Sequence, residues 1–225
     1  MSKLKIVAIS DVHCKWNKLV IPECDILISC GDYSFRGEKH VVKNFHTWLN
    51  KQDARYVISV QGNHELWVEK NFLEAKQVAE EACPGVYFID EGLVEIEGIK
   101  IYGSAITPFF CDWAWNRYPE GLIKAWNKIP DDTNILISHG PPYDILDKTT
   151  YANGDPRPEP LGCSFLMHRI KQLKELSLHF FGHIHWQGGQ TVNKDGVSYF
   201  NTAVCDEMYL PTNPITIVDF NKEEE

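Results

Sequence analysis

The fold is decided by the stretch Phe181-Gly182-His183-Ile184-His185, which ends an apolar run and carries two histidines one residue apart. Side chains alternate in direction along an extended segment, so His183 and His185 are predicted to point the same way. Two imidazoles that project from one segment are typical of metal ligands. A lone histidine in an apolar run is more often a core residue with one hydrogen bond, so this stretch needs support from the rest of the chain.

Four other short polar clusters supply that support, because each also ends an apolar, strand-like run. They are Asp11-Val12-His13, Gly31-Asp32, Gly62-Asn63-His64-Glu65 and Ser138-His139-Gly140. The first half of the chain alternates strand and helix patterns, which predicts right-handed crossovers and a largely parallel sheet. Polar residues at successive carboxyl ends are then expected to gather at one edge.

Composition limits what these clusters can mean. With 225 residues, 44% hydrophobic and 24% charged, the chain is predicted to form a single domain over residues 1–225, with 221–225 as a frayed tail. The net charge of -9 argues against a protein that grips long nucleic acid through its overall field, whereas a small anionic substrate remains open.

Location is predicted from the cysteines and from the absence of long apolar runs. The seven cysteines show no repeated spacing and are expected to be packing residues of a protein in a reducing compartment. No stretch approaches the about eighteen apolar residues of a membrane span, so we expect a cytoplasmic protein without a membrane partner.

The expected elements follow from hydrophobic periodicity. Strands are predicted over 5–10, 25–30, 55–60, 135–138, 178–181 and 214–220, and helices over 38–51, 71–83 and 162–176. From residue 86 the period changes to two, which predicts a second, more antiparallel sheet with hairpins at Glu97-Gly98 and Asp195-Gly196. His40 and His46 are expected on the surface of the first helix.

Two segments are candidates for the rim of a site. Residues 107–126 are rich in aromatic side chains and form either an apolar loop tucked under the sheets or a platform for base stacking. Residues 147–160 contain Asn153-Gly154 and three prolines near the end, so regular structure is not expected there and the segment is a candidate lid or rim.

The ordered motifs resemble the calcineurin-like metallophosphoesterase superfamily, from Ile6 to about Phe220. Several phrases are similar to its metallophosphoesterase-domain-containing, 239AB-type branch, among them 28–32, Trp48-Leu49, 62–65, 139–142, Gly162-Cys163 and 179–185. The resemblance implies a four-layer α/β/β/α sandwich, in which two mixed sheets are flanked by helices.

The residue types suit a centre of two divalent ions, which together clamp a phosphoryl group and activate a water molecule. Asp32 is the natural bridge, because a carboxylate offers one oxygen to each ion. The resemblance implies Asp11, His13 and His185 beside Asp32 at one ion, and Asn63, His139 and His183 beside it at the other. Such mixed imidazole, carboxylate and amide ligands suit manganese, iron, zinc or nickel better than calcium.

The expected reaction is attack on phosphorus by a hydroxide held between the ions. With both carboxylates and the hydroxide, the centre keeps about one positive charge and would attract an anion. The motif places His64 to protonate the leaving oxygen as general acid, and the alternative is a structural imidazole behind the ligands.

Residues 31–37 also resemble the Gly-Asp-x-x-Asp-Arg-Gly signature of serine/threonine protein phosphatases. Arg36 matches the arginine that contacts phosphate there, but Phe35 replaces the aspartate that orients the catalytic histidine. Glu65 is a possible substitute for that aspartate, although an ordinary surface carboxylate is the simpler expectation. This departure argues against a protein phosphatase. Because Arg36 is the one plausible cation near the motifs and tryptophans supply aromatic surface there, we expect a phosphodiesterase acting on small diesters, such as nucleotides and cyclic nucleotides.

Substrate contacts are expected from Asn63, Arg36 and Trp186. Trp186 follows His185 directly, so it is the first candidate for stacking on a base, and a buried packing role is the alternative. The other functions left open are a phosphomonoesterase, protein phosphatase or nuclease of the same superfamily, and a binding module without turnover. The complete set of candidate ligands argues against the last.

Overall fold

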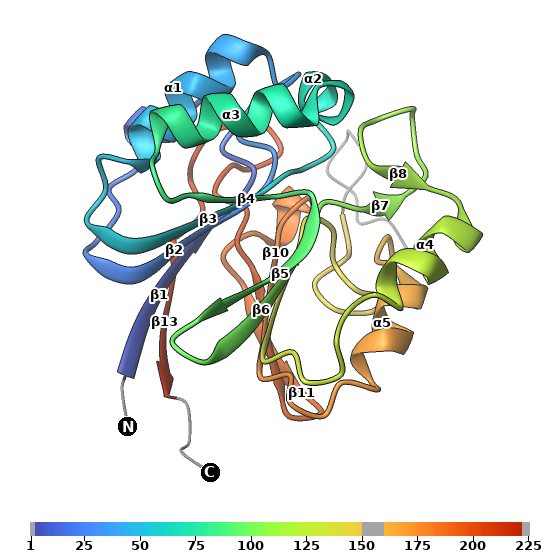
Figure 1. Cartoon of the computed structure of the whole chain (residues 1–225). Helices are drawn as coiled ribbons and strands as arrows, with labels where there is room; N and C mark the ends of the chain where they lie inside the picture. The colour runs from blue at the N-terminus through green and yellow to red at the C-terminus, as the bar shows by residue number, and fades with distance from the viewer. Residues whose placement is uncertain (1–2, 150–159, 222–225) are drawn as a thin grey trace.

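The computed structural model describes residues 3–149 and 160–221, whose strands form two large mixed sheets (Figure 1). In chain order the elements are β1 (Lys3–Ile9), a 3-10 turn (Trp16–Lys18), β2 (Cys24–Cys30), α1 (Lys39–Leu49), β3 (Ala54–Val60), α2 (Leu66–Lys70), α3 (Phe72–Ala82), β4 (Tyr87–Ile89), β5 (Glu91–Ile96), β6 (Ile99–Ser104), β7 (Thr107–Pro108), β8 (Asn116–Arg117), α4 (Pro119–Trp126), β9 (Ile135–Ser138), α5 (Ser164–Ile170), β10 (Leu178–Phe181), a 3-10 turn (His185–Gln187), β11 (Thr191–Lys194), β12 (Val197–Asn201) and β13 (Thr216–Asn221).

The first sheet has the order β13-β1-β2-β3-β4. Strands β1 to β4 are mutually parallel and β13 pairs antiparallel with β1. Ile6, Ile26 and Ile58 in its central strands are fully buried, as expected for apolar runs covered on both faces. The strands predicted over 5–10, 25–30 and 55–60 are confirmed.

The second sheet has the order β11-β12-β10-β9-β6-β5, with antiparallel pairs at its two edges and parallel pairs between them. Both predicted hairpins are present. Glu97 and Gly98 have φ values of 51° and 75°, and Asp195 and Gly196 have values of 52° and 82°, so each hairpin closes through a left-handed pair.

Helices lie outside the two sheets, which gives the predicted four-layer α/β/β/α sandwich. Helices α1 and α3 cover the first sheet, and α4 and α5 lie beside the second (Figure 1). Helix α1 buries Val42, Phe45 and Leu49, which recur at the spacing of one helix face. His46, predicted on the surface of this helix, is instead fully buried, whereas His40 is exposed. The buried apolar side chains form one cluster.

Two short helices and one helix end were not predicted correctly. Helix α2 precedes α3, and α4 lies inside the aromatic-rich segment, where Pro119 occupies the first turn and Leu122, Ala125 and Trp126 are buried. The helix predicted over 162–176 ends at Ile170. Leu173 and Leu176 are buried all the same, so the apolar spacing alone did not reveal that the helix had ended.

The carboxyl ends of the two sheets meet. The Ser10 N–H donates to the Thr202 carbonyl oxygen (2.9 Å), which joins the loop after β1 of the first sheet to the loop after β12 of the second. Within the second sheet, the Gly182 N–H donates to the His139 carbonyl oxygen (2.8 Å) and joins the loops after β10 and β9. Polar residues that follow different strands are thereby brought to one edge.

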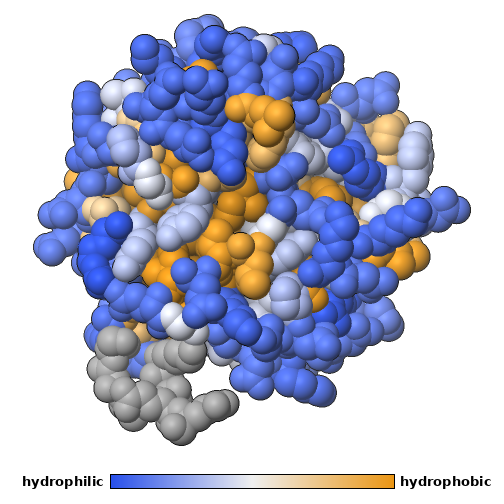
Figure 2. Space-filling view, in the orientation of Figure 1, coloured by the Kyte–Doolittle hydropathy of each residue, from blue (hydrophilic) through white to orange (hydrophobic). Residues whose placement is uncertain are grey.

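Two segments for which the sequence made predictions lie wholly or partly outside the described residues. Residues 150–159, most of the predicted lid, and tail residues 222–225 lie outside them, while Asn221 belongs to β13. No helix within 3–149 or 160–221 is long and apolar enough to cross a membrane. On the face shown in Figure 2, apolar residues form a band across a mainly polar surface.

Candidate metal centre

The site residues leave their strands through left-handed backbone turns. Asp11, His13, Asp32 and His183 have φ values of 52°, 42°, 53° and 68°, which non-glycine residues rarely adopt. The prediction that His183 and His185 project from one extended segment is therefore wrong. Strand β10 ends at Phe181 and His185 begins a 3-10 turn, so the two imidazoles reach different clusters.

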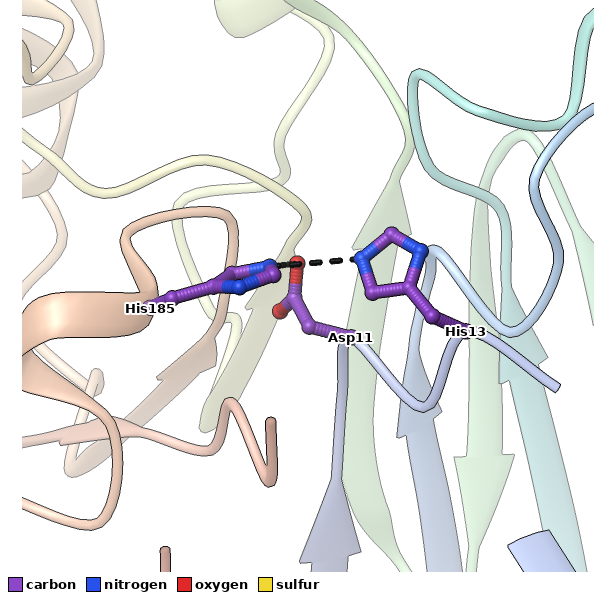
Figure 3. Close-up of side chains that lie close together, drawn as sticks. All are labelled: Asp11, His13 and His185. Carbon is purple, nitrogen blue, oxygen red and sulfur yellow. Dashed lines mark hydrogen bonds and ion pairs between the residues drawn. The ribbon is translucent and has the colours of Figure 1, made fainter. Parts of the chain in front are cut away.

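The first cluster consists of Asp11, His13 and His185 (Figure 3). The His185 Nε2 atom lies 3.2 Å from Asp11 Oδ1 and 3.2 Å from the Nε2 atom of His13. Asp11 and His13 are fully buried, and His185 is partly buried. The second Asp11 oxygen accepts a hydrogen bond from the backbone N–H of His183 (2.8 Å), which ties this cluster to the backbone of another candidate ligand.

The second cluster consists of Asp32, His139 and His183. The His139 Nε2 atom lies 3.2 Å from Asp32 Oδ2 and 2.7 Å from the Asn63 side-chain oxygen. The Asp32 carboxylate also belongs to a group with His13 and His64, so it borders both clusters. The turn beside Asp32 permits no side chain at Gly62, where a Cβ atom would lie 2.3 Å from Asp32 Oδ1.

Three of the histidines are fixed from behind by backbone carbonyl groups. The Nδ1 atoms of His13, His139 and His185 lie 3.2, 2.9 and 2.9 Å from the carbonyl oxygens of Ser34, Cys30 and Asp206. A carbonyl oxygen only accepts, so each Nδ1 carries a hydrogen and each ring turns its Nε2 atom inward, where the neutral form presents a lone pair. Lone pairs and carboxylate oxygens that converge in this way fit bound cations.

The charges of the buried groups agree with this donor set. Burial by itself would raise the pKa of Asp11, but the hydrogen bond and charge of His185 outweigh it and lower the pKa below its usual range. Burial would likewise raise the pKa of Asp32, but the charge and hydrogen bond of His139 outweigh it and lower the pKa. Burial lowers the pKa of both His13 and His183 to about 4. Burial also opposes charge on His139 and His185, but the Asp32 and Asp11 carboxylates outweigh it and raise the pKa of each ring to about 9. The centre therefore combines ionised carboxylates with two neutral imidazoles, His13 and His183, and with two imidazoles that the carboxylates hold protonated until a cation takes the place of the proton.

His64 lies at the open side of this centre and is held differently. Its Nε2 atom is 3.9 Å from Asp32 Oδ2, and its Nδ1 atom lies 3.1 Å from the carbonyl oxygen of Phe35. The residue that replaces the aspartate of the protein phosphatase signature thus supplies the partner of His64 through its backbone. Only 14% of the His64 side chain is exposed.

Glu65, expected as a surface carboxylate or a partner of His64, is neither. It is fully buried, and its oxygens accept hydrogen bonds from the N–H groups of Asp32, Ser34 and Gly62 and from the Ser34 hydroxyl. Burial and then the nearby Asp32 carboxylate raise the pKa of Glu65 to about 8, while the bonds from Ser34 and Gly62 oppose that shift. Glu65 ties the turn after β2 to the turn after β3.

A cavity of about 310 Å³ opens over the centre. Its lining residues are Asp32, Asn63, His64, Phe110, Trp113, Thr149, His183, His185, Glu207 and Tyr209. Neither Arg36, which is exposed, nor Trp186, which is 52% exposed, lines this cavity. Both interpretations of the aromatic-rich segment hold for part of it. Trp115 is buried, whereas Phe110 and Trp113 face the cavity.

Tyr209 and Glu207 were not singled out from the sequence. The Tyr209 ring lies edge-on to His13 and His185, with ring centroids 4.7 and 5.4 Å apart. Glu207 accepts a hydrogen bond from the Thr149 hydroxyl across the cavity (3.1 Å). Both residues sit in an irregular loop without periodicity. In the sequence, the signal for this loop was the short apolar run that follows Cys205.

Two mixed sheets between helices, with carboxylates and imidazoles converging at their carboxyl edge, define a metal-dependent hydrolase. Residues 4–187 match the calcineurin-like phosphoesterase family, and the chain belongs to that family. It is accordingly a metal-dependent phosphoesterase.

Named relatives and solved structures agree with this assignment. The chain is 31% identical to human metallophosphoesterase domain-containing protein 1 over 96% of its own length and 70% of that protein. It is 30% identical to a UPF0046 protein of Caenorhabditis elegans, over 94% of the chain and 74% of the relative. The fold is similar to that of phosphopantetheinyl hydrolase from Mycobacterium tuberculosis, with a TM-score of 0.60, 17% identity and coverage of 91% and 90%.

Proposed function

We propose that the protein is a two-metal phosphodiesterase that hydrolyses small diesters, including nucleotides and cyclic nucleotides. The lining of the cavity over the centre carries this proposal. Within the described residues that lining contains three aromatic side chains and the Glu207 carboxylate, but no lysine or arginine.

The charge of the lining favours diesters. A phosphate monoester carries up to two negative charges at neutral pH and a diester carries one. The second charge of a monoester would need an extra cation, and the described residues that line the cavity include no lysine or arginine. Arg36, the cation expected there, lies on an exposed turn and does not line the cavity.

The metal ligands proposed are those predicted from the sequence. Asp11, His13 and His185 would hold one ion and Asn63, His139 and His183 the other, with Asp32 shared. Manganese, iron, zinc and nickel all suit these donors. Two such ions, when bound, polarise a phosphoryl oxygen and lower the pKa of an attacking water molecule.

The chain itself supplies proton transfer and shielding. The Phe35 carbonyl oxygen holds the Nδ1–H of His64, which leaves Nε2 on the cavity side. The imidazolium form of the ring, protonated at both nitrogens, would give its Nε2 proton to the leaving oxygen and become the neutral ring that keeps only Nδ1–H. Phe110, Trp113 and Tyr209 line the same cavity and would limit the access of water to that oxygen. His64 is therefore proposed as the general acid.

Aromatic walls also support nucleotide substrates. Stacking of a base on an aromatic side chain contributes about 1 to 3 kcal/mol and tolerates any base. Trp113 faces the cavity, so it replaces Trp186 as the first candidate for this contact. The net charge of -9 still argues against long nucleic acid as a substrate.

The cytoplasm is proposed as the location. All seven cysteines are described and unpaired, and five of them are buried in packing positions. Free thiols in such number are typical of a reducing compartment.

The test compares substrates that share one leaving group. With each candidate metal, kcat/KM is measured for 4-nitrophenyl phosphate, methyl 4-nitrophenyl phosphate and thymidine 5′-(4-nitrophenyl phosphate). We expect the methyl diester to exceed the monoester and the nucleoside diester to exceed the methyl diester. Glu207→Lys should raise monoester turnover relative to diester turnover, because it adds a positively charged side chain to the cavity lining.

Two outcomes would contradict the proposal. A monoester that is turned over faster than both diesters would favour a phosphatase. No turnover of any of these esters by fully metal-loaded protein would favour a binding module. Thymidine itself serves as a control, since it should inhibit only if the nucleoside is bound.

A further inference from the structure

The His64 ring is anchored by a backbone carbonyl oxygen and has no carboxylate of the described residues within hydrogen-bond distance. It makes one hydrogen bond, from Nδ1–H to the Phe35 carbonyl oxygen (3.1 Å). One such bond fixes the position of Nδ1 but leaves the ring free to turn about it. A carboxylate, as in the protein phosphatase signature, would bind more strongly because hydrogen bonds to charged acceptors are shorter and stronger. Something else must fix the plane of this ring if Nε2 is to face a leaving oxygen.

Trp113 contacts the face of that ring. The centroids of the two rings are 4.3 Å apart and their planes are inclined by 34°. On another side the His13 ring meets His64 at 83°, with centroids 4.9 Å apart. The imidazole therefore contacts both an indole and a ring that is itself held by the Ser34 carbonyl oxygen.

The loop that carries Trp113 is tied to the residue beside His64. The Ala114 N–H donates to the Asn63 carbonyl oxygen (3.1 Å), and the Asn116 side-chain amide donates to the Phe110 carbonyl oxygen (2.6 Å). Cys111 and Asp112 in this loop have left-handed φ values of 49° and 50°. Two successive residues keep such rare conformations only when the surrounding bonds hold them. The loop therefore fixes the position from which the Trp113 side chain projects.

We propose that Trp113 is a positioning residue that sets the plane of the His64 imidazole and so directs Nε2 toward the leaving oxygen. Trp113 supplies through ring contact the orientation that a carboxylate partner supplies elsewhere. This inference rests on the proposed role of His64 as general acid. Trp113 is half-buried on a loop, so its replacement leaves the two sheets and their core intact.

The experiment separates proton transfer from binding by varying only the leaving group. Rates at saturation are measured for methyl phenyl phosphate and methyl 4-nitrophenyl phosphate, because a general acid matters most for the poorer leaving group, phenol. We expect both His64→Ala and Trp113→Leu to lose about tenfold or more on the phenyl ester relative to the nitrophenyl ester. Trp113→Phe, which keeps a flat face, should restore the wild-type ratio.

Two further variants sharpen the comparison. Phe109→Leu removes an aromatic ring from the same loop, but Phe109 stacks on Tyr118 and does not line the cavity, so it should keep the wild-type ratio. The double variant His64→Ala/Trp113→Leu should show the leaving-group dependence of His64→Ala alone, since a positioning residue has nothing left to position.

A spectroscopic readout is independent of turnover. An indole face that lies over an imidazole shifts the carbon-bound imidazole protons upfield. In metal-free protein, Trp113→Leu should move the NMR signals of His64, assigned by their loss in His64→Ala, toward the positions of an exposed histidine. Trp113→Phe should keep part of the shift.

The outcomes distinguish this inference from the proposed function. If His64→Ala changes the leaving-group dependence but Trp113→Leu changes only KM, Trp113 is a wall of the cavity and the positioning role is wrong. If His64→Ala loses equally on both esters, the general-acid role fails and the positioning role fails with it. Unchanged His64 signals in Trp113→Leu would also overturn the inference.

Discussion

His46 and the histidines of the first cluster differ in the partners of their ring nitrogens. The His46 Nδ1–H donates to the Val42 carbonyl oxygen (2.7 Å), and Nε2 lies 3.1 Å from the Ser59 hydroxyl, which can donate to it. Both nitrogens are satisfied by neutral groups. His13 and His185 instead turn their Nε2 atoms toward each other and His185 also faces the Asp11 carboxylate, an arrangement that a cation stabilises.

His46 predicts a pH dependence of stability. Burial lowers its pKa from 6.5 to about 4, so between these values the unfolded chain binds a proton that the folded chain does not. The contribution of His46 to the free energy of unfolding is therefore at its maximum above pH 6.5, and it falls as the pH drops toward 4. At one unit of pKa per about 1.4 kcal/mol, the loss at pH 5 is about 2 kcal/mol.

Urea unfolding of wild type and His46→Gln at pH 7 and pH 5 measures this effect. The variant should be less stable at pH 7 and should lose less stability than wild type on going to pH 5. His40→Gln, on the exposed face of the same helix, is the matched control and should follow wild type. If His46→Gln and wild type lose the same amount, this account of His46 is wrong.

At the level of elements, the loop after β12 supports one half of the centre. The Asp206 carbonyl oxygen holds the Nδ1–H of His185 (2.9 Å). Its carboxylate accepts hydrogen bonds from the Met208 and Leu210 N–H groups and from the Thr212 hydroxyl. These bonds close the loop that places Tyr209, at a left-handed φ of 57°, over the imidazoles of the first cluster.

Asp206→Ala is expected to weaken one metal site and spare the other. Loss of the three side-chain bonds loosens the support of His185, and groups behind metal ligands typically contribute about 10- to 100-fold to metal affinity. Calorimetric titration of metal-free protein should show one site weakened about tenfold or more, while the site of Asn63, His139 and His183 keeps its affinity. Asp219→Ala, which breaks only an exposed ion pair with Lys3, is the control. Equal weakening of both sites, or of neither, would contradict this role.

Over the whole molecule, the gathering of the candidate ligands at one edge could be predicted from sequence because of parallel topology. Asp11, Asp32 and Asn63 each follow a strand of the first sheet, and parallel strands bring their carboxyl ends together whatever their loops do. His139 and His183 follow neighbouring strands of the second sheet in the same way.

The walls of the cavity could not be predicted by that reasoning. Trp113 and Tyr209 reach the centre through loops that contain left-handed residues, and no hydrophobic period marks the path of such loops. Trp186 is next to a ligand in sequence, yet the 3-10 turn leaves its side chain exposed and outside the cavity lining. Proximity along the chain was therefore a poor guide to proximity in the site.

The central claim is that one carboxylate, Asp32, is shared by two metal ions, and metal content with turnover in matched variants tests it most directly. Ions per chain and diester kcat are measured for wild type, Asp32→Asn and Asp11→Asn, each purified with the same metal. We predict two ions in wild type, about one in Asp11→Asn because the second cluster remains, and fewer than two in Asp32→Asn with a far greater loss of turnover than in Asp11→Asn. Asp32→Asn protein with two ions per chain and wild-type turnover would contradict the account.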